Sequence, residues 1–356
     1  MIDSDRIRSR LRGALLGAVI GDALIGAGCG PPPSGASHPA PDRVPGRSEL
    51  EAARAVLVAR QAPAGEGAAP DPLRYSVFAH EALVLAEFLV ELGPLPDDLE
   101  RLAPEPEAIA SFLAARRDRS RGAGDGSLPV LDRIAAGGAW DDALGVVDRE
   151  VAARVGAAAR VTPVAAYLHD RPEHLHRLAE STALATHPQP GGIDGAVILA
   201  QSLSLLTTVG LSGARLEPVY FFRALVARIM AHGSGESLLE KVGAACDAAA
   251  TRAPVGVLRD EIGNGLASVE AVPAAIGLVL RAAGEPAAAL GLAVMLGGEH
   301  AAIGCMVGAL VGAYAGEEAL PAVLVEGLDR DAGATARARS LADRLVALRG
   351  GRAAVS

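Results

Sequence analysis

GGEHAAIGCMVGALVGAYAG, residues 297–316, is the stretch of sequence that decides the fold. Within it glycine returns every fourth residue, at positions 304, 308, 312 and 316. Side chains four residues apart share one face of a helix, so this spacing makes a smooth stripe that lets another helix backbone approach closely. A second stripe lies near the start of the chain, at Gly13, Gly17 and Gly21. The two stripes predict two buried central helices that are tightly packed and able to pack against each other.

Apolar residues recur with helical periodicity along the whole chain, while the alternating patterns typical of strands are nearly absent. We therefore expect an all-α fold, organised as a single domain over residues 1–356. Residues 28–47 and 61–72 lack this periodicity and are predicted to be irregular, as surface loops, lids or disordered segments. The expected helices span residues 5–28, 48–61, 74–93, 107–117, 128–136, 141–158, 160–168, 173–186, 192–208, 217–232, 235–250, 257–264, 270–282, 286–296, 301–315 and 335–349.

Composition and charge exclude some classes of partner. Half of the 356 residues are hydrophobic, which is enough to bury a large core. Binding to nucleic acid needs a basic face that releases counterions, so the net charge of −9 argues against a nucleic-acid partner. The three cysteines, Cys29, Cys246 and Cys305, lack the spacing of a metal site and lie in apolar surroundings. They indicate buried thiols in a reducing compartment.

The start of the chain argues for a soluble protein. Charges of both signs precede the first apolar run, which is not the layout of a signal peptide. That run, residues 13–30, is long enough to span a bilayer, yet Asp22 stands near its middle, where an acid costs roughly 3 kcal/mol. We therefore expect a cytoplasmic protein with no membrane partner. For Asp22 we favour capping of backbone N–H groups or pairing with an arginine over direct chemistry.

Four segments, in this order, resemble the ADP-ribosylglycohydrolase family, which includes the dinitrogenase reductase-activating glycohydrolases. They are RGALLGAVIGDAL (12–24), ATHPQP (185–190), GNGLASVEAVPAA (263–275) and the stretch at 297–316, with a weaker match in RGAGDGSLPVL (121–131). The resemblance implies a single-domain, orthogonal multi-helical bundle. It also implies a central cleft in which two divalent cations, usually magnesium, support cleavage of the glycosidic bond between ADP-ribose and a protein side chain.

The family takes its metal ligands from three places, and this chain departs from the pattern at each. Where the family has a glutamate after the first glycine-rich helix, this chain reads AGCG, and Cys29 is the residue nearest the matching position. The T-D-D-T motif is matched by Ser76-Val77-Phe78-Ala79, and G-G-D-T-D-T by residues 297–302, where Glu299 is the remaining carboxylate. Magnesium prefers six hard oxygen ligands in octahedral geometry. We therefore expect no metal and no other cofactor, and loss of any hydrolysis that uses metal-activated water.

Three residues are candidate acid–base groups. Glu299 and His300 lie just before the second glycine helix, where Glu299 could act as a general base or simply cap the helix. His80 lies beside the altered T-D-D-T match and could join them in one cleft. A mixed His and Glu metal site is the less favoured alternative, because neighbours such as His80 and Glu81 point about 100° apart on a helix.

Other residues are candidates for contact with a ligand. The resemblance implies that Gly156 and Arg160 match a segment that cradles ADP-ribose, and that His187 lies near the substrate. For His187, turn chemistry before Pro188 is an equal alternative. The complete candidate set is Gly156, Arg160, His187, Asp22, Ser76 and Glu81.

The leading functional hypothesis is a divergent family member that keeps a cleft for a small-molecule ligand, such as ADP-ribose or another nucleotide or ribose compound. Such a pseudoenzyme would have a binding or regulatory role. The alternative is an enzyme repurposed to metal-independent chemistry, with Glu299, His300 and His80 as acid–base groups. A second alternative is residual hydrolysis of ADP-ribosyl N- or O-glycosidic bonds.

Overall fold

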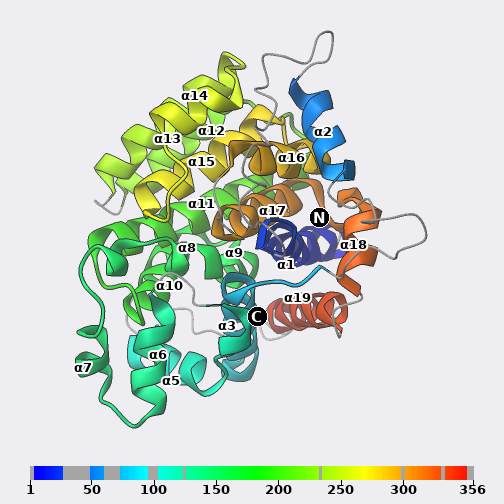
Figure 1. Cartoon of the computed structure of the whole chain (residues 1–356). Coiled ribbons are helices and arrows are strands. Elements are labelled where there is room, and N and C mark those ends of the chain that lie inside the picture. The colour runs from blue at the N-terminus through cyan, green and yellow to red at the C-terminus, as the bar shows by residue number, and fades with distance from the viewer. Residues whose placement is uncertain are drawn as a thin grey trace.

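The computed structural model describes residues 4–26, 49–59, 73–94, 103–122, 126–231, 235–297, 301–329 and 333–350. The two stretches predicted to be irregular, 28–47 and 61–72, lie outside these described residues. Within the described ranges every regular element is a helix, which confirms the all-α prediction (Figure 1).

The helices follow one another along the chain with short connections. The first part contains α1 (Ser4–Gly26), α2 (Glu49–Ala59), α3 (Val77–Leu92), α5 (Pro106–Ala115), η2 (Arg119–Arg121), α6 (Ser127–Ala135), α7 (Trp140–Leu144), η3 (Val151–Ala153), α8 (Gly156–Arg160), α9 (Thr162–Leu168) and α10 (Pro172–Leu184). The second part contains α11 (Pro190–Ser212), α12 (Pro218–Met230), α13 (Glu236–Ala250), α14 (Val255–Glu261), α15 (Ser268–Arg281), α16 (Pro286–Leu296), α17 (Ala301–Ala315), η4 (Glu317–Ala319), α18 (Ala322–Asp329) and α19 (Ala334–Gly350).

The two glycine stripes face each other at the contact between α1 and α17. A Cβ atom placed on Gly17 would collide with the carbonyl group of Gly308, and one on Gly21 with the carbonyl of Gly304. Gly13 stands in the same relation to Gly312. Residues 301–313 of α17 are all buried. The prediction of two buried, closely packed helices is therefore confirmed, and their contact is backbone against backbone.

The other helices surround this central pair (Figure 1). On one side lie α2 and the helices α12 to α16, and on the other lie α3, α5, α6 and α10. The last two helices, α18 and α19, pack beside α1. α11 runs through the middle and contacts α17, α10 and α15. Among the described helices, α11 is long and apolar enough to cross a membrane, but 83% of its apolar window is buried inside the protein, as in a core helix.

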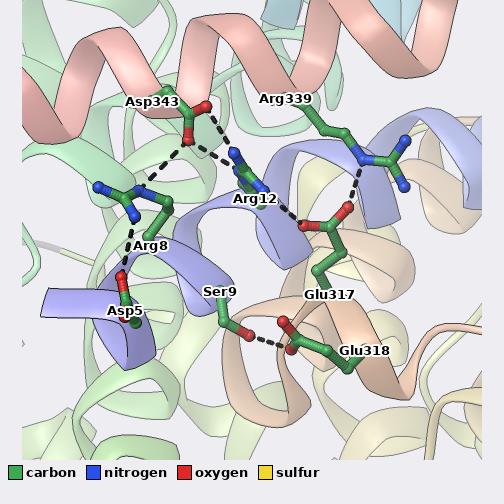
Figure 2. Close-up of polar contacts among 8 residues, drawn as sticks. All are labelled: Asp5, Arg8, Ser9, Arg12, Glu317, Glu318, Arg339 and Asp343. Atoms are coloured by element: carbon green, nitrogen blue, oxygen red, sulfur yellow. Dashed lines mark hydrogen bonds and ion pairs between the residues drawn. The ribbon is translucent and has the colours of Figure 1, made fainter. Parts of the chain in front are cut away.

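Ion pairs fasten the C-terminal helix α19 to the start of α1 (Figure 2). Arg12 donates from Nε and Nη2 to the two carboxylate oxygens of Asp343, at 2.7 and 2.6 Å. These hydrogen bonds raise the pKa of Arg12. Arg8 lies 3.7 Å from the same carboxylate, and Glu317 pairs with both Arg12 and Arg339. Partly exposed pairs of this kind contribute at most about 1 kcal/mol each to the stability of the fold.

One predicted helix is wrong, and one observed α-helix, α18, lies outside every predicted range. The single helix expected over 141–158 is interrupted, because α7 ends at its C-cap Gly145 and the side chain of Asp148 accepts the N–H of Val151 at 2.9 Å. Short polar side chains of this type compete with the helix for backbone hydrogen bonds. The missed α-helix, α18, follows Pro321 and has 8 residues.

Replacing Gly308 with alanine tests the backbone contact. The new Cβ would overlap the carbonyl group of Gly17, so the two helices would have to separate. We expect Gly308→Ala to lower the free energy of unfolding by about 3 kcal/mol, measured by urea titration with circular dichroism.

Gly256→Ala is the matched control for this experiment. Gly256 also lies in a helix, α14, but a Cβ there would meet only a guanidinium nitrogen of Arg259, at 3.4 Å. Its replacement should leave the free energy of unfolding unchanged or raise it by up to about 1 kcal/mol. Equal losses in the two variants would contradict the contact.

Candidate functional site

The candidate site is built around the N-terminal end of α3. Asp22 of α1 is fully buried and accepts three hydrogen bonds there, from Ser76 N at 2.7 Å, Ser76 Oγ at 2.9 Å and Ala79 N at 2.7 Å. The backbone N–H groups of a first helical turn have no partner within the helix, and they favour a negative charge. Asp22 therefore caps the start of α3 together with the N-cap residue Ser76, whose Oγ accepts the N–H of Phe78 at 3.4 Å. This agrees with the capping interpretation, and the contact joins α1 to α3.

Burial makes the Asp22 carboxylate unusual. Desolvation raises its pKa to about 6, while the hydrogen bonds from Ser76 and Ala79 and the charge of Arg121 act in the opposite direction. Cys305 of α17 is also fully buried, and desolvation followed by the nearby charge of Asp22 raises the pKa of its thiol. That thiol stays protonated, which matches the expectation of a buried, inert cysteine.

A second polar group lies one turn further along α3, where Glu81 and Arg160 form a buried ion pair. Arg160 of α8 is 0% exposed, and its Nη1 donates to Glu81 Oε2 at 2.9 Å. The other carboxylate oxygen of Glu81 accepts the hydroxyl of Ser127, from α6, at 2.5 Å. Both oxygens of Glu81 are thus engaged, and three helices meet at this pair.

The hydrogen bonds continue from Arg160 to His187. Arg160 Nη2 donates to the carbonyl of Thr182 at 2.7 Å and to Thr186 Oγ1 at 2.6 Å. Thr186 Oγ1 lies 2.7 Å from His187 Nδ1. Glu81, Arg160 and His187, which the sequence analysis named separately, therefore belong to one buried network. Because Nη1 and Nη2 of the buried Arg160 donate to protein groups, we infer that Arg160 holds this network together.

Gly156 lies where α8 meets the loop 263–267. Val155 N donates to Leu266 O at 2.9 Å, and Gly265 N donates to Glu270 Oε2 at 2.8 Å. Asn264 Nδ2 donates to Leu296 O at 3.3 Å and Gly297 O at 3.1 Å. This loop, which carries one of the four family-like segments, therefore ties the start of α8 to the end of α16.

His80 points away from Glu81 and contacts a different part of the protein. Its Nε2 donates to the carbonyl of Arg116 at 2.8 Å, because a carbonyl oxygen can only accept. Its Nδ1 is buried and has no hydrogen-bond partner among the described residues. Desolvation lowers the pKa of His80, and the charges of Arg337 and Arg121 lower it further against the hydrogen bond to Arg116, which raises it.

The structure joins some of the predicted site residues and leaves others apart. Asp22 contacts Ser76, and Glu81 is linked to His187, whereas His80 belongs to neither group. Glu299 and His300 lie outside the described residues, so their proposed roles stay predictions.

The sequence analysis missed the connecting residues of the network. Ser127 and Thr186 carry hydrogen bonds on either side of the buried ion pair. For Ser127 the available signal was its place directly before the helix predicted over 128–136. For Thr186 it was its place directly before the candidate His187.

Comparisons with known proteins agree on family and fold. A sequence model described as ADP-ribosylglycohydrolase matches residues 3–354. A solved structure entitled "ADP-ribosylglycohydrolase-related protein complex" aligns with a TM-score of 0.61 and 22% sequence identity, over 97% of this chain and 99% of that chain. At this identity the structural match supports the fold alone. A comparison with curated protein sequences gives no significant match.

Breaking the buried ion pair should destabilise the protein strongly. Glu81→Leu leaves the Arg160 charge buried without its carboxylate, and we expect the free energy of unfolding to fall by about 3 to 5 kcal/mol. The double variant Glu81→Leu/Arg160→Met removes both charges and should lose less than the single variant. Chemical denaturation measures both.

The exposed pair between Arg54 and Glu285 provides the control for this comparison. Its side chains are 46% and 39% exposed, so Arg54→Gln should change the free energy of unfolding by less than about 1 kcal/mol. A double variant that is less stable than Glu81→Leu alone would contradict the role of the unpaired charge.

The raised pKa of Asp22 predicts a pH dependence with a definite sign. Folded Asp22 titrates at about 6 instead of 3.8, so between these values the folded state holds more protons than the unfolded state. The stability contributed by Asp22 is present below the lower value and is lost as the pH rises through the higher one. Relative to Asp22→Asn, the wild type should therefore lose about 2 to 3 kcal/mol between about pH 4 and pH 7.

Denaturation of the two proteins across this range measures the difference. The asparagine side chain of the variant does not titrate, so groups common to both proteins cancel. A difference that is constant with pH, or that grows in favour of the wild type as the pH rises, would show that Asp22 has an ordinary or lowered pKa.

Proposed function

Because the chain belongs to the ADP-ribosylglycohydrolase family, we propose that it is a divergent member that binds an ADP-ribose-like ligand and lacks the dinuclear magnesium centre. On this proposal it is a binding or regulatory protein. The family match over residues 3–354 supports the class of ligand. The side chains at the first turn of α3 support the loss of the metals.

The first turn of α3 carries this proposal. Val77 and Phe78, which match the two aspartates of the family motif, are 2% and 9% exposed and offer no oxygen ligand. The hydroxyl of Ser76 already donates to Asp22. Magnesium needs hard oxygen ligands, and apolar side chains supply none. The residues at this place therefore do not fit a pair of magnesium ions.

The nearest carboxylates are committed to other partners. Asp22 accepts three hydrogen bonds from the start of α3, and both oxygens of Glu81 are bound by Ser127 and Arg160. Turning either group toward a metal would leave buried donors unpaired, including the Arg160 guanidinium, at a cost of about 1 to 3 kcal/mol or more for each. At the third family motif Glu299 remains the sole carboxylate of residues 297–302. This donor set supports binding without metal-dependent hydrolysis.

We propose that the scaffold of a ligand site is retained. The loop 263–267 is held against the start of α8 and the end of α16, and α8 is joined to α17 by the contact of Cys305 Sγ with Ala159 O at 3.5 Å. Segments that are far apart in the sequence and carry the family resemblance are thereby fixed in relation to one another. We propose that these backbone elements orient the ligand, with the network from Glu81 to His187 as their rigid support.

A second candidate function is metal-independent catalysis, and the state of His80 favours it. The lowered pKa keeps the imidazole neutral near pH 7, and its buried Nδ1 is an acceptor without a partner among the described residues. A neutral histidine with a free acceptor nitrogen is suited to act as a general base. In this candidate, Glu299 and His300 would complete the acid–base set.

Ligand-induced stabilisation separates these functions. At about 100 times Kd a ligand that binds only the folded state adds about 2.7 kcal/mol, which corresponds to a rise in Tm of roughly 3 to 6 °C. We expect ADP-ribose to produce such a rise, and to produce it equally in magnesium and in EDTA. Ribose 5-phosphate and AMP, as parts of the ligand, should give smaller shifts.

Activity assays on ADP-ribosylated peptides complete the test. Stabilisation by ADP-ribose that requires magnesium, or magnesium-dependent release of ADP-ribose, would contradict the proposal. Release in EDTA that is abolished by His80→Gln would establish the second candidate. Arg54→Gln, at the exposed ion pair, is the control that should leave binding unchanged.

A further inference from the structure

The loop 263–267 is folded around the side chain of Glu270. Gly265 N donates to Glu270 Oε2 at 2.8 Å, and a Cβ atom on Gly263 or on Gly265 would collide with the same side chain. Gly263 also has a φ of +103°, a conformation that glycine adopts readily. The carboxylate therefore occupies space that the two glycines leave free, and the conformation of the loop depends on the position of this side chain.

Glu270 also completes the start of α15. The N-cap residue of this helix, Ala267, makes no side-chain capping hydrogen bond. Glu270 lies in the first turn, where the field of the helix favours a carboxylate, and its side chain reaches back to a backbone N–H before the helix, as in a capping box. Among the described residues it has no cationic partner. Its role is therefore to hold the loop and the start of α15 together.

The loop carries this geometry to two other helices. Val155 N, at the start of α8, donates to Leu266 O at 2.9 Å. On the other side, the side chain of Asn264 donates to two carbonyl groups at the end of α16. The base of the loop is held separately, because Lys241 of α13 donates to Ile262 O at 2.9 Å. A change at Glu270 is therefore expected to alter the loop while the helix before it stays in place.

α8 connects the loop to the buried polar network. This helix has 5 residues, from Gly156 to Arg160, so the position of Val155 fixes where Arg160 lies. Arg160 pairs with Glu81 and is linked through a threonine hydroxyl to His187. The conformation of the loop therefore determines how α8 and this network are placed beneath the proposed ligand.

We propose that Glu270 is a positioning residue of the ligand site, whose carboxylate sets the conformation of loop 263–267 and thereby the start of α8. This role rests on the proposed function, because it concerns the same ligand, and it requires no contact between Glu270 and the ligand. Without the carboxylate the loop occupies additional conformations that do not bind. The apparent Kd then rises in proportion to the loss of the binding-competent state.

Amide hydrogen exchange in the full chain, measured by NMR, tests the effect on the loop. The amide of Val155 reports the attachment of the loop to α8, and the amide of Arg154, which donates to Val151 O at 3.1 Å, is the neighbouring control. In Glu270→Ala the opening constant of the Val155 amide should rise by about tenfold, with Arg154 unchanged. Glu270→Gln should restore the wild-type value, because the glutamine oxygen can still accept the N–H of Gly265.

Calorimetric titration with ADP-ribose tests the effect on the ligand site. Glu270→Ala should raise Kd by about tenfold, and Glu270→Gln by less than about twofold. Glu49→Ala is the matched control, because Glu49 also accepts a backbone N–H, from Val255 at 2.7 Å, and pairs with Arg281 at the opposite end of α15. This variant should lower Tm and leave Kd unchanged.

The two measurements separate the role of Glu270 from the proposed function. A wild type that does not bind ADP-ribose overturns the proposed function, and the exchange of the Val155 amide then decides whether Glu270 sets the loop. The role of Glu270 is overturned if Glu270→Ala leaves either the Val155 exchange or the Kd of a binding wild type unchanged. It is also overturned if Glu49→Ala weakens binding equally, or if Glu270→Gln shows the same losses as Glu270→Ala.

Discussion

The rest of the structure depends on the contact between the backbones of α1 and α17. Gly13, Gly17 and Gly21 lie against the backbones of Gly312, Gly308 and Gly304, so the distance between the two helices is set by their main chains. Such a contact tolerates neither sliding nor rotation, because any movement brings a flanking side chain against a carbonyl group. Asp22 follows Gly21 directly, so the packing of α1 against α17 fixes the position of Asp22 in the core.

From that place Asp22 determines where α3 begins. Its carboxylate accepts hydrogen bonds from the N–H groups of Ser76 and Ala79 at the start of α3. Farther along the same helix, Glu81 pairs with Arg160, and His80 donates to the carbonyl group of Arg116. A buried carboxylate is unfavourable unless its partners are supplied by rigid neighbours. Here α1 supplies the charge and α3 supplies the donors, and each helix holds the other in position. The polar groups of the candidate site are thus consequences of the central glycine contact.

The sequence was informative where the signal is local. A glycine every fourth residue indicates a close helix contact whatever the partner is, and α16 and α17 have the predicted bounds. The sequence was uninformative about contacts between residues that are far apart in the chain. Glu81 and Arg160 are 79 residues apart in the sequence, and nothing in either segment predicts that their side chains form an ion pair. The break after Gly145 is local, yet it involves a single hydrogen bond from the N–H of Val151 to the side chain of Asp148, which hydrophobic periodicity does not reveal.

The same physics explains why the metal ligands and the metals would be lost together. Aspartates at positions 77 and 78 would stand beside Asp22 in a buried first turn, and without cations their like charges would repel. Valine and phenylalanine remove that repulsion and fill the space with apolar volume. Asp22 can remain because α3 itself satisfies it through three hydrogen bonds. With Asp22 present and apolar residues at positions 77 and 78, the first turn of α3 has the charge distribution that the proposed function requires.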